Sequence, residues 1–354
     1  MSDRRKVIVA GLSPRFFVNQ IAIMKEYDIS MIADSSEIKE KMNEYMGYPI
    51  GTFGEIKDYD HDEILIVSRS RCMSLIKMLL SMGIDREEIV IWNPKLCLND
   101  SEYSLKVDEN GSIRASVHKG DTRIEATLCA FSDLVVFEEI YLQNTYRFVS
   151  VEDTVLIDVG MNIALASLFF ASKGFIKKVY GFEPFKPTYE RALKNLSLNE
   201  KSLSDKIRVY NYGLGEEDGE QTVHYLADNP GYMRAGKEAV PADPGDECAE
   251  TAIIKEAGPE ILKIMDKNPG ASFAMKIDCE GAEYEIIPNL IRHGALKRIS
   301  IIVMESHYGR EDEIIEAFRR EGFVVYSNEA APYRTGTLFA VRKPAKSGNK
   351  RCRQ

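Results

Sequence analysis

The sequence predicts an α/β protein with mostly parallel sheets, on three observations. Short apolar runs with strand character alternate with stretches of helical spacing along most of the 354 residues. Two of these runs end in an aspartate and are followed by a glycine and a helical stretch, at residues 155–172 and 272–291. The chain is also too long for one ordinary hydrophobic core, so we expect two domains.

The first domain is expected over residues 1–95, as a small Rossmann-like accessory unit with a parallel sheet. Its expected strands are 7–10, 29–33, 64–67 and 89–92, and its expected helices are 15–27, 35–46 and 72–82. The first turn contains one glycine, Gly11, where a dinucleotide fingerprint has three. A packing module is therefore favoured here, and phosphate binding is the alternative.

Residues 96–120 are expected to form a β-hairpin connector. Strands at 103–107 and 112–117 flank an Asn-Gly turn, which is typical of tight hairpins. Residues 121–146 are expected to be helical and to cover the edge of the next domain. Four aromatic residues favour packing there: Phe131, Phe137, Tyr141 and Tyr146.

The second domain is expected over residues 121–343, followed by a solvated basic tail, 344–354. Its expected strands are 155–157, 178–182, 207–212, 273–277, 299–305, 322–327 and 337–342. Residues 328–336 are too few for a crossover helix, so the last strand should be antiparallel. Residues 227–250 read as an irregular insertion, which favours a substrate loop.

Composition narrows the functional classes. The net charge of −9 argues against nucleic-acid binding. The six cysteines contain no Cys-x-x-Cys pair, which excludes the common zinc and redox motifs. No apolar run is long enough for a membrane span, and the first residues do not resemble a signal peptide. We therefore expect a cytoplasmic protein with reduced thiols.

Polar residues recur at the carboxyl ends of the predicted strands, where open parallel sheets bind ligands. In chain order they are Asp158, Glu183, the turn Asn211-Tyr212-Gly213-Leu214, Asp278, Glu305 and His307. An aspartate beside a helix start disfavours phosphate and suits a cationic group, while Glu183 is placed to hold ribose hydroxyls. Gly160 allows close approach to the backbone. S-adenosylmethionine fits this description. Helix capping by Asp158 and solvation of Glu183 are the alternatives.

Three motifs in this region resemble those of the FkbM-type methyltransferases, over roughly residues 125–342. They are Asp158-Val-Gly-Met-Asn-Ile163 with Ser167, Gly181-Phe-Glu-Pro184 with Asn195 and Asn199, and Lys276-Ile-Asp-Cys-Glu-Gly-Ala-Glu283. The third motif is the most distinctive. One position departs from the pattern, since Ala164 stands where the family usually has glycine.

This resemblance implies a seven-stranded Rossmann-like domain that transfers a methyl group from S-adenosylmethionine to a hydroxyl of a sugar, glycan or other small metabolite. The cofactor residues that we expect are Asp158, Gly160, Met161, Asn162, Ser167, Glu183, Pro184, Tyr212, Gly213 and Asp278. The domain before residue 96 resembles modules that are sometimes fused to such enzymes.

Catalytic residues are expected at the ends of the fourth and fifth strands. Methyl transfer needs a positioned hydroxyl and a base, and the candidates are Asp278, Glu280 and His307. We expect Glu280 to open the following helix, and His307 to be the base near neutral pH. A structural role for each is the alternative. Asp278, Glu305 and His307 could also hold a divalent metal, although their spacing does not require one, and we expect none.

Two other functional classes stay open: an NAD(P)-dependent dehydrogenase or epimerase, and a non-catalytic binding protein with the same fold. The first lacks its glycine fingerprint at both first turns. We expect a small-molecule or glycan partner and neither nucleic acid nor membrane. The oligomeric state is open, with a homodimer as one alternative.

Overall fold

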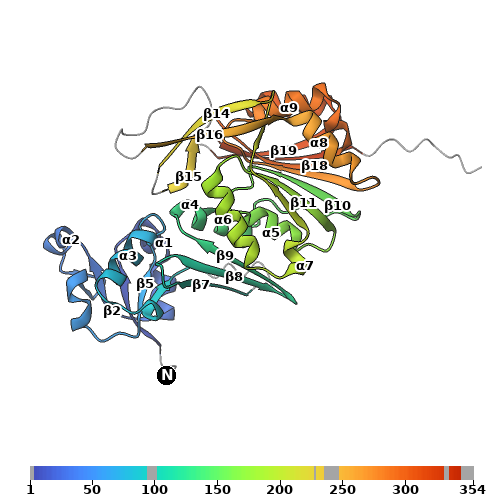
Figure 1. Ribbon diagram of the computed structural model, residues 1–354. Helices are drawn as coiled ribbons and strands as arrows, with labels where there is room; N and C mark the ends of the chain where they lie inside the picture. Colours follow the sequence, from blue (N-terminus) through green and yellow to red (C-terminus); the bar gives the residue numbers. More distant parts are fainter. Residues whose placement is uncertain (1–3, 94–101, 227–228, 235–246, 331–334, 344–354) are drawn as a thin grey trace, which may run out of the picture. The chain divides into compact units, whose positions relative to one another are not determined.

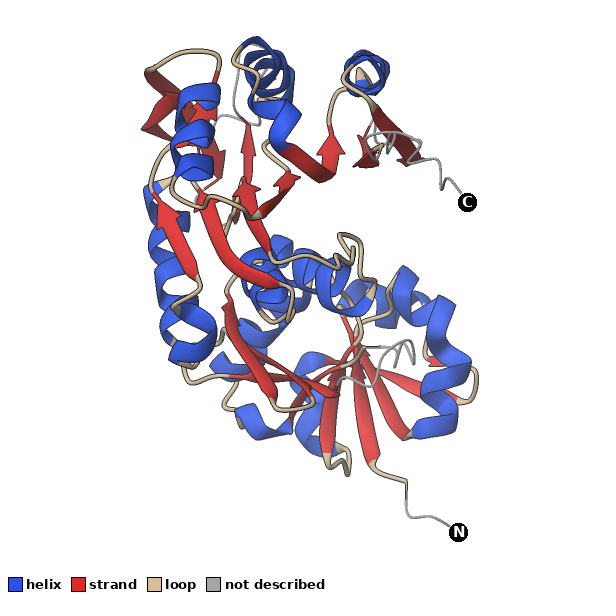
Figure 2. Cartoon of the chain, turned by 90° about the vertical axis from the view of Figure 1, so that its right-hand side faces the viewer, coloured by secondary structure: helices blue, strands red, loops and turns tan. Residues whose placement is uncertain are grey.

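The computed structural model describes residues 4–93, 102–226, 229–234, 247–330 and 335–343. The chain divides into two compact units, Met1–Gln143 and Asn144–Gln354. Figures 1 and 2 draw both units. The basic tail and part of the expected insertion lie outside the described residues. Among the described helices, none has the length and apolar character that crossing a membrane requires. The predicted α/β class is confirmed.

The first unit contains a nine-stranded sheet whose parallel part consists of the four predicted strands and one that was not predicted, β4. Its parallel strands are β1 (Lys6–Ala10), β2 (Asp28–Asp34), β4 (Tyr48–Thr52), β5 (Glu63–Ile66) and β6 (Ile89–Ile91). Helices α1 (Pro14–Glu26), α2 (Ser36–Lys41) and α3 (Cys72–Ser81) accompany them. Figure 2 shows helices on both sides of these strands.

The predicted second helix is too long. It ends at Lys41, and a short hairpin of β3 (Glu44–Tyr45) and β4 follows, with a 3-10 helix at Phe53–Asp58. Met46 and Gly47 form the hairpin turn with φ of 52° and 87°, which a helix cannot contain. The turn residues therefore outweighed the helical spacing.

The predicted hairpin after residue 102 is confirmed, but the helix after it begins later than expected. Strands β7 (Glu102–Val107) and β8 (Ile113–Lys119) pair antiparallel and extend the first unit's sheet. Residues 122–128 form a further strand, β9 (Thr122–Leu128), rather than a helix. Alternate residues of β9 are buried, as in a strand with one face on a core. The helical part is α4 (Phe131–Phe137) with a π-helix at Glu138–Leu142.

The second unit contains a seven-stranded sheet with one reversed strand. In spatial order its strands are β12 (Ile207–Tyr210), β11 (Ile176–Phe182), β10 (Thr154–Val159), β17 (Ser272–Ile277), β18 (Ile299–Ser306), β20 (Thr335–Arg342) and β19 (Phe323–Ala330). Strand β20 is antiparallel to both of its neighbours, as predicted. Neighbouring strands β10 and β17 are far apart in the chain, so the order of the sheet reverses between them.

The helices of this unit lie on the two faces of the sheet (Figure 1). On one side are α5 (Leu165–Ala171), α6 (Lys186–Ser197) and α7 (Lys201–Ser204), and on the other are α8 (Ala257–Asp266), α9 (Glu283–Arg292) and α10 (Glu311–Arg320). Helices after β10 and β11 thus lie opposite those after β17 and β18. Right-handed crossovers produce this reversal, and open α/β sheets bind ligands outside the carboxyl ends of the strands where it occurs.

A second, four-stranded sheet includes part of the region that we expected to be irregular. Its order is β13 (Gly213–Gly215), β16 (Glu247–Glu256), β14 (Gly219–Leu226) and β15 (Asn229–Arg234). The expectation of an irregular insertion is therefore wrong for residues 229–234 and 247–250. The Pro and Gly residues that suggested a loop are concentrated in 235–246, outside the described residues.

Candidate active site

The turn after β10 depends on a glycine. Gly160 has φ 72°, and a Cβ atom built on it would lie 1.7 Å from the carbonyl oxygen of Asp278. The backbone N–H groups of Gly160 and Met161 both donate to the carbonyl of Phe182, at 3.1 and 2.9 Å. Lys276 Nζ donates to the Gly160 carbonyl at 2.6 Å. The turn is therefore in direct contact with β11 and with the loop after β17.

Residues 161–164 continue this turn and direct one amide toward Glu183. The buried Met161 fills the space above Gly181, where a Cβ would lie 2.4 Å from its sulfur. Asn162 has φ 53°, and its N–H donates to Glu183 Oε2 at 3.0 Å. Ala164 also has a left-handed backbone, with φ 69°. A preference for glycine at that position is therefore explained by backbone conformation.

Asp158, at the end of β10, is fully buried next to a buried cation. Ser167 Oγ donates to Asp158 Oδ2 at 2.6 Å, and Lys276 Nζ lies 3.3 Å from Oδ1. Burial opposes a charge on Lys276, but Asp158 and Asp278 outweigh it and raise the pKa of Lys276 above its usual range. The predicted cofactor residues Asp158 and Ser167 are thus brought together, with a lysine between Asp158 and the next loop.

Glu183, at the end of β11, is buried and accepts two backbone hydrogen bonds. Oε1 accepts from the N–H of Phe185 at 2.9 Å, and Oε2 accepts from Asn162. Burial raises the pKa of Glu183 to about 7, and these two donors oppose that rise. A carboxylate has about four acceptor positions, so Glu183 retains capacity for ligand hydroxyls.

The loop after β12 brings Gly213 against Pro184. A Cβ on Gly213 would lie 3.3 Å from Pro184 Cβ, so the glycine lets the two segments meet. The ring of Tyr212 packs on Phe182, with centroids 5.5 Å apart. The Tyr212 hydroxyl donates to Glu260 on α8 at 3.1 Å. Pro184 and Gly213 therefore lie together, while the Tyr212 hydroxyl is bound to α8.

The loop after β17 is tightly turned, and Glu280 does not open the next helix. Helix α9 begins at Glu283, with Ala282 as its N-cap. Glu280 and Gly281 have φ of 53° and 108°, which no helix accommodates. A Cβ on Gly281 would lie 2.5 Å from the ring of Tyr308. This turn replaces the helical start that we predicted and leaves the Glu280 side chain 47% exposed.

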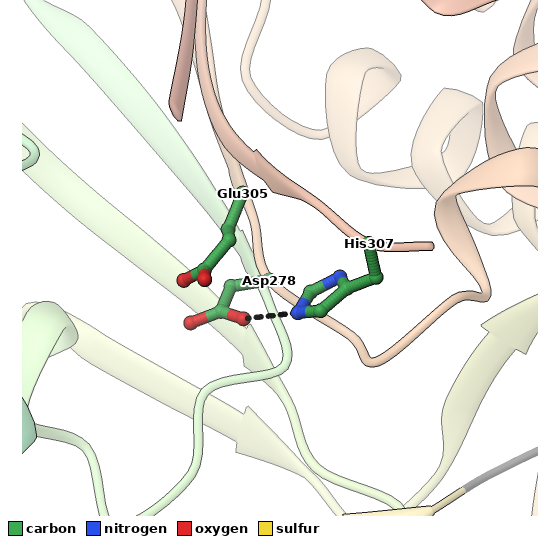
Figure 3. A group of neighbouring side chains, drawn as sticks. All are labelled: Asp278, Glu305 and His307. Atoms are coloured by element: carbon green, nitrogen blue, oxygen red, sulfur yellow. Dashed lines mark ion pairs between the residues drawn. The ribbon is translucent and has the colours of Figure 1, made fainter. Parts of the chain in front are cut away.

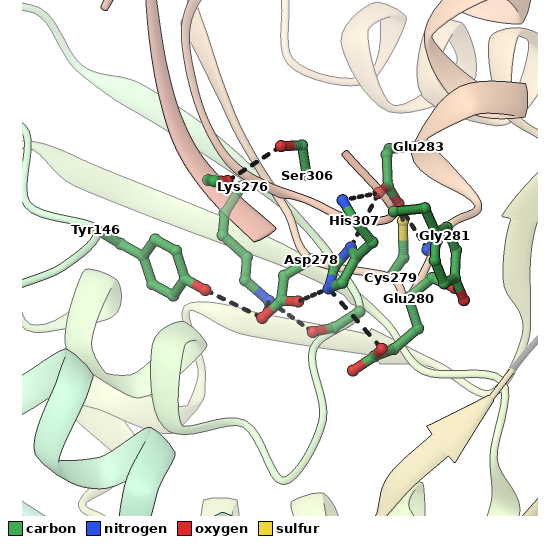
Figure 4. Close-up of polar contacts among 12 residues, drawn as sticks. Tyr146, Lys276, Asp278, Cys279, Glu280, Gly281, Glu283, Ser306 and His307 are labelled. Atoms are coloured by element: carbon green, nitrogen blue, oxygen red, sulfur yellow. Dashed lines mark hydrogen bonds and ion pairs between the residues drawn. The ribbon is translucent and has the colours of Figure 1, made fainter. Parts of the chain in front are cut away.

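His307 is held by a buried carboxylate on α9 (Figure 4). Glu283 Oε1 lies 2.9 Å from His307 Nδ1 and also accepts from the His307 backbone N–H at 2.9 Å. Glu283 Oε2 accepts from the N–H of Gly281 at 2.8 Å. Burial opposes a charge on His307, but Glu283 outweighs it and raises the pKa of His307 to about 9. The other ring nitrogen, Nε2, lies 3.8 Å from Glu280 and 3.9 Å from Asp278.

Asp278 is the residue that links the parts of the site. Its Oδ2 accepts from the Tyr146 hydroxyl at 3.0 Å and lies 3.7 Å from Lys276 Nζ. Its Oδ1 faces His307 Nε2. One ligand atom from each of Asp278, Glu305 and His307 lies within 4.8 Å of the others (Figure 3). The three residues that we predicted to be catalytic, Asp278, Glu280 and His307, are therefore neighbours.

The sequence did not assign three residues that shape this group. Lys276 could have been found, because a lysine in an apolar strand needs a buried acidic partner. Glu283 could have been placed on the buried face of its helix from the helical spacing. Tyr146 contacts Asp278 across 132 residues of sequence, and no local pattern indicates that contact.

A family model for the methyltransferase FkbM domain matches residues 158–325. The chain is 28% identical over 231 residues to the AMB antimetabolite synthetase AmbE of Pseudomonas aeruginosa, a match that covers 54% of this chain and 10% of that protein. It is 23% identical over 233 residues to the methyltransferase sdnD of Sordaria araneosa, covering 59% of this chain and 89% of that one. The matched region is thus a small part of AmbE and most of sdnD.

Among solved structures, the chain is similar to methyltransferase FkbM from Methylobacillus flagellatus KT. That likeness has 15% identity and a TM-score of 0.38, and it covers 95% of this chain and 90% of the other. The family match confirms the resemblance that the motifs indicated.

Proposed function

We propose that this chain, whose residues 158–325 match the methyltransferase FkbM domain, transfers a methyl group from S-adenosylmethionine to a hydroxyl of a sugar, glycan or other small metabolite. One observation carries the proposal. At the reversal of strand order, the Gly160 turn touches the loop that holds Asp278, next to His307. A turn suited to the methyl donor thus adjoins polar groups suited to a hydroxyl.

The residues of the β10 and β11 strand ends fit the donor. The methyl donor supplies a methyl group already activated on a sulfonium. Glu183 would accept hydrogen bonds from ribose hydroxyls, next to Pro184 and Gly213. The turn at Gly160, Met161 and Asn162 would approach the ligand through its backbone, which a Cβ at position 160 would prevent. Asp158 and Ser167 support the turn from beneath, since both are fully buried.

We assign binding of the acceptor hydroxyl to Asp278, Glu280 and His307, the acceptor group. His307 Nε2 lies 3.9 Å from Asp278 and 3.8 Å from Glu280, and these two carboxylates are partly exposed, so an acceptor oxygen can reach them. Because the donor is already activated, these residues position the hydroxyl in line with the methyl group, and one of the two carboxylates receives its proton. With its pKa raised to about 9, His307 is already protonated near neutral pH, so it does not fit the base role that we expected for it. Asp278 also contacts Lys276, which connects the acceptor group to the Gly160 turn.

Calorimetry with S-adenosylhomocysteine and with NAD tests the donor assignment. We expect S-adenosylhomocysteine to bind and NAD not to bind. Glu183→Gln should weaken S-adenosylhomocysteine by about 1–3 kcal/mol, as expected for hydrogen bonds to a charged group. The control is Glu190→Gln on the exposed face of α6, which should change nothing. Binding of NAD alone would support a dehydrogenase, and binding of neither would support a non-catalytic protein.

Transfer of a labelled methyl group to candidate alcohols tests the acceptor class. The matched set contains a sugar, its O-methylated form and its amino analogue. Transfer to the free sugar only is the expected result. Transfer to the amine and not to the alcohol would overturn the O-methyl assignment while leaving the family intact.

A further inference from the structure

Three side chains suited to a divalent cation, two carboxylates and one imidazole, meet at the acceptor group. Asp278 follows β17, and Glu305 and His307 lie at the end of the neighbouring strand β18. One carboxylate oxygen from each acid and one imidazole nitrogen lie within 4.8 Å of one another (Figure 3). Ligand atoms on a six-coordinate ion with bonds of about 2.1 Å lie about 3 Å apart. Small rotations of the partly exposed Asp278 and Glu305 side chains would therefore close the set.

The imidazole is oriented as it is in metal sites. Nδ1 of His307 lies 2.9 Å from Glu283, a carboxylate with no exposed surface. Histidines that bind metals through one nitrogen commonly donate the other N–H to a carboxylate, which fixes the ring and its tautomer. Glu283 itself lies outside the ligand set and accepts further backbone hydrogen bonds from Gly281 and His307. The contact leaves Nε2 directed toward Asp278 and Glu280.

The two oxygens of Asp278 are used differently. Oδ2 accepts from the Tyr146 hydroxyl and faces Lys276, whereas Oδ1 faces His307 Nε2. This arrangement anchors one carboxylate oxygen and presents the other to the group. The local charge also favours a cation, because four carboxylates surround His307 and Lys276 is the nearby lysine. These carboxylates are Asp278, Glu280, Glu283 and Glu305.

We propose that Asp278, Glu305 and His307 bind a divalent cation of the Mn²⁺ class, and that this ion binds the acceptor. Mixed carboxylate and imidazole ligands suit such ions. Three protein ligands leave coordination positions for two neighbouring oxygens of one substrate, so the acceptor class is a vicinal diol. This second part rests on the proposed O-methyl transfer, while the ion site does not.

With the ion bound, each bond that forms or breaks during methyl transfer can be accounted for. A hydroxyl bound to a divalent cation becomes more acidic. Its O–H bond breaks and the proton passes to the Glu280 carboxylate, which lies 3.8 Å from His307 Nε2. The oxygen then forms a bond to the methyl carbon. The carbon–sulfur bond breaks, and its electron pair remains on sulfur as a neutral thioether.

The ion site is tested by titrating the full chain with Mn²⁺ alone. The electron paramagnetic resonance signal of free Mn²⁺ reports how much of the ion is bound. We expect one bound ion. His307→Ala and Glu305→Gln should each weaken it at least tenfold, and Glu283→Gln should weaken it about 10–100-fold through loss of the supporting hydrogen bond. His293→Ala is the matched control, because His293 also pairs with a carboxylate, Glu256, at 2.8 Å. It should leave Mn²⁺ affinity unchanged.

Absence of Mn²⁺ binding in the folded wild type overturns the inference, and so does equal binding by His307→Ala and Glu305→Gln. If one variant fails to fold by circular dichroism, the other decides the question. Calorimetry with S-adenosylhomocysteine, with and without EDTA, separates this result from the proposed function. Retained S-adenosylhomocysteine binding without Mn²⁺ binding rejects the ion alone. Loss of S-adenosylhomocysteine binding in both conditions rejects the donor assignment instead.

Discussion

Gly160→Ala should be among the most damaging single-methyl changes in the second unit. The new Cβ would lie 1.7 Å from the Asp278 carbonyl oxygen, whereas ordinary contacts begin near 3.4 Å. The turn and the loop after β17 must therefore separate by more than an ångström. That separation breaks the bond from Lys276 Nζ to the residue 160 carbonyl and the bond from the Asp278 N–H to the Val159 carbonyl.

The magnitude follows from these losses. A left-handed alanine costs about 1 kcal/mol, the bond to a charged donor about 1.5–3 kcal/mol, and the backbone bond about 1 kcal/mol. We expect a loss of about 4 kcal/mol in the free energy of unfolding. A shift of the turn by an ångström should also lower methyl transfer about 100-fold.

Gly294→Ala supplies the control for this prediction. Gly294 has φ 71°, one degree from Gly160, but a Cβ there meets nothing within 4 Å. Gly294→Ala should lower the free energy of unfolding by about 1 kcal/mol, from backbone conformation alone. Urea unfolding followed by circular dichroism measures both variants. A Gly160→Ala loss within about 1 kcal/mol of the Gly294→Ala loss would refute the contact between turn and loop.

Three further outcomes follow from buried charges. The pKa of Glu183 is raised from 4.5 to about 7, so its stabilising contribution is complete below pH 4.5 and is lost as pH rises through 7. Glu183→Gln should therefore remove about 3 kcal/mol of pH dependence from unfolding measured between pH 4.5 and 7.5, and Glu190→Gln should remove none. Lys276→Met leaves Asp158 buried without its cation and should cost about 3–5 kcal/mol, and adding Asp158→Asn should recover part of that loss in a double-mutant cycle. Additive losses would mean that the pair does not interact. Glu283→Ala leaves the buried N–H groups of Gly281 and His307 without their acceptor and should lower the free energy of unfolding by about 3 kcal/mol. A loss below 1 kcal/mol would contradict the buried role of Glu283.

Periodicity predicted most of the second unit because its strands are short, apolar and separated by helices of ordinary length. The antiparallel direction of the last two strands was also predictable, since residues 328–336 cannot form a crossover. Residues 122–128 were misjudged because their alternating pattern was joined to the helical spacing that follows. The turn at Gly120, with φ 56°, marks the true break between β8 and β9.

The site was predictable at the level of strand ends and not at the level of contacts. Parallel strands bring their carboxyl ends to one edge, so Asp158, Glu183 and Asp278 could be grouped from sequence. The conformation of Glu280 could not, because helix preference does not reveal that Gly281 adopts φ 108° against the Tyr308 ring. Contacts between distant segments depend on tertiary packing.

One lysine joins structures that would otherwise be separable. Lys276 touches Asp158, the Gly160 carbonyl and Asp278, so a single ammonium connects the end of β10 with the loop after β17. Movement of the β10 half of the site relative to the β17 half would leave that buried charge without part of its partners. The two halves should consequently show the same slow amide exchange and open as one cooperative segment. Adaptation to new acceptors is then left to segments outside this rigid centre, such as the small sheet of β13, β14, β15 and β16.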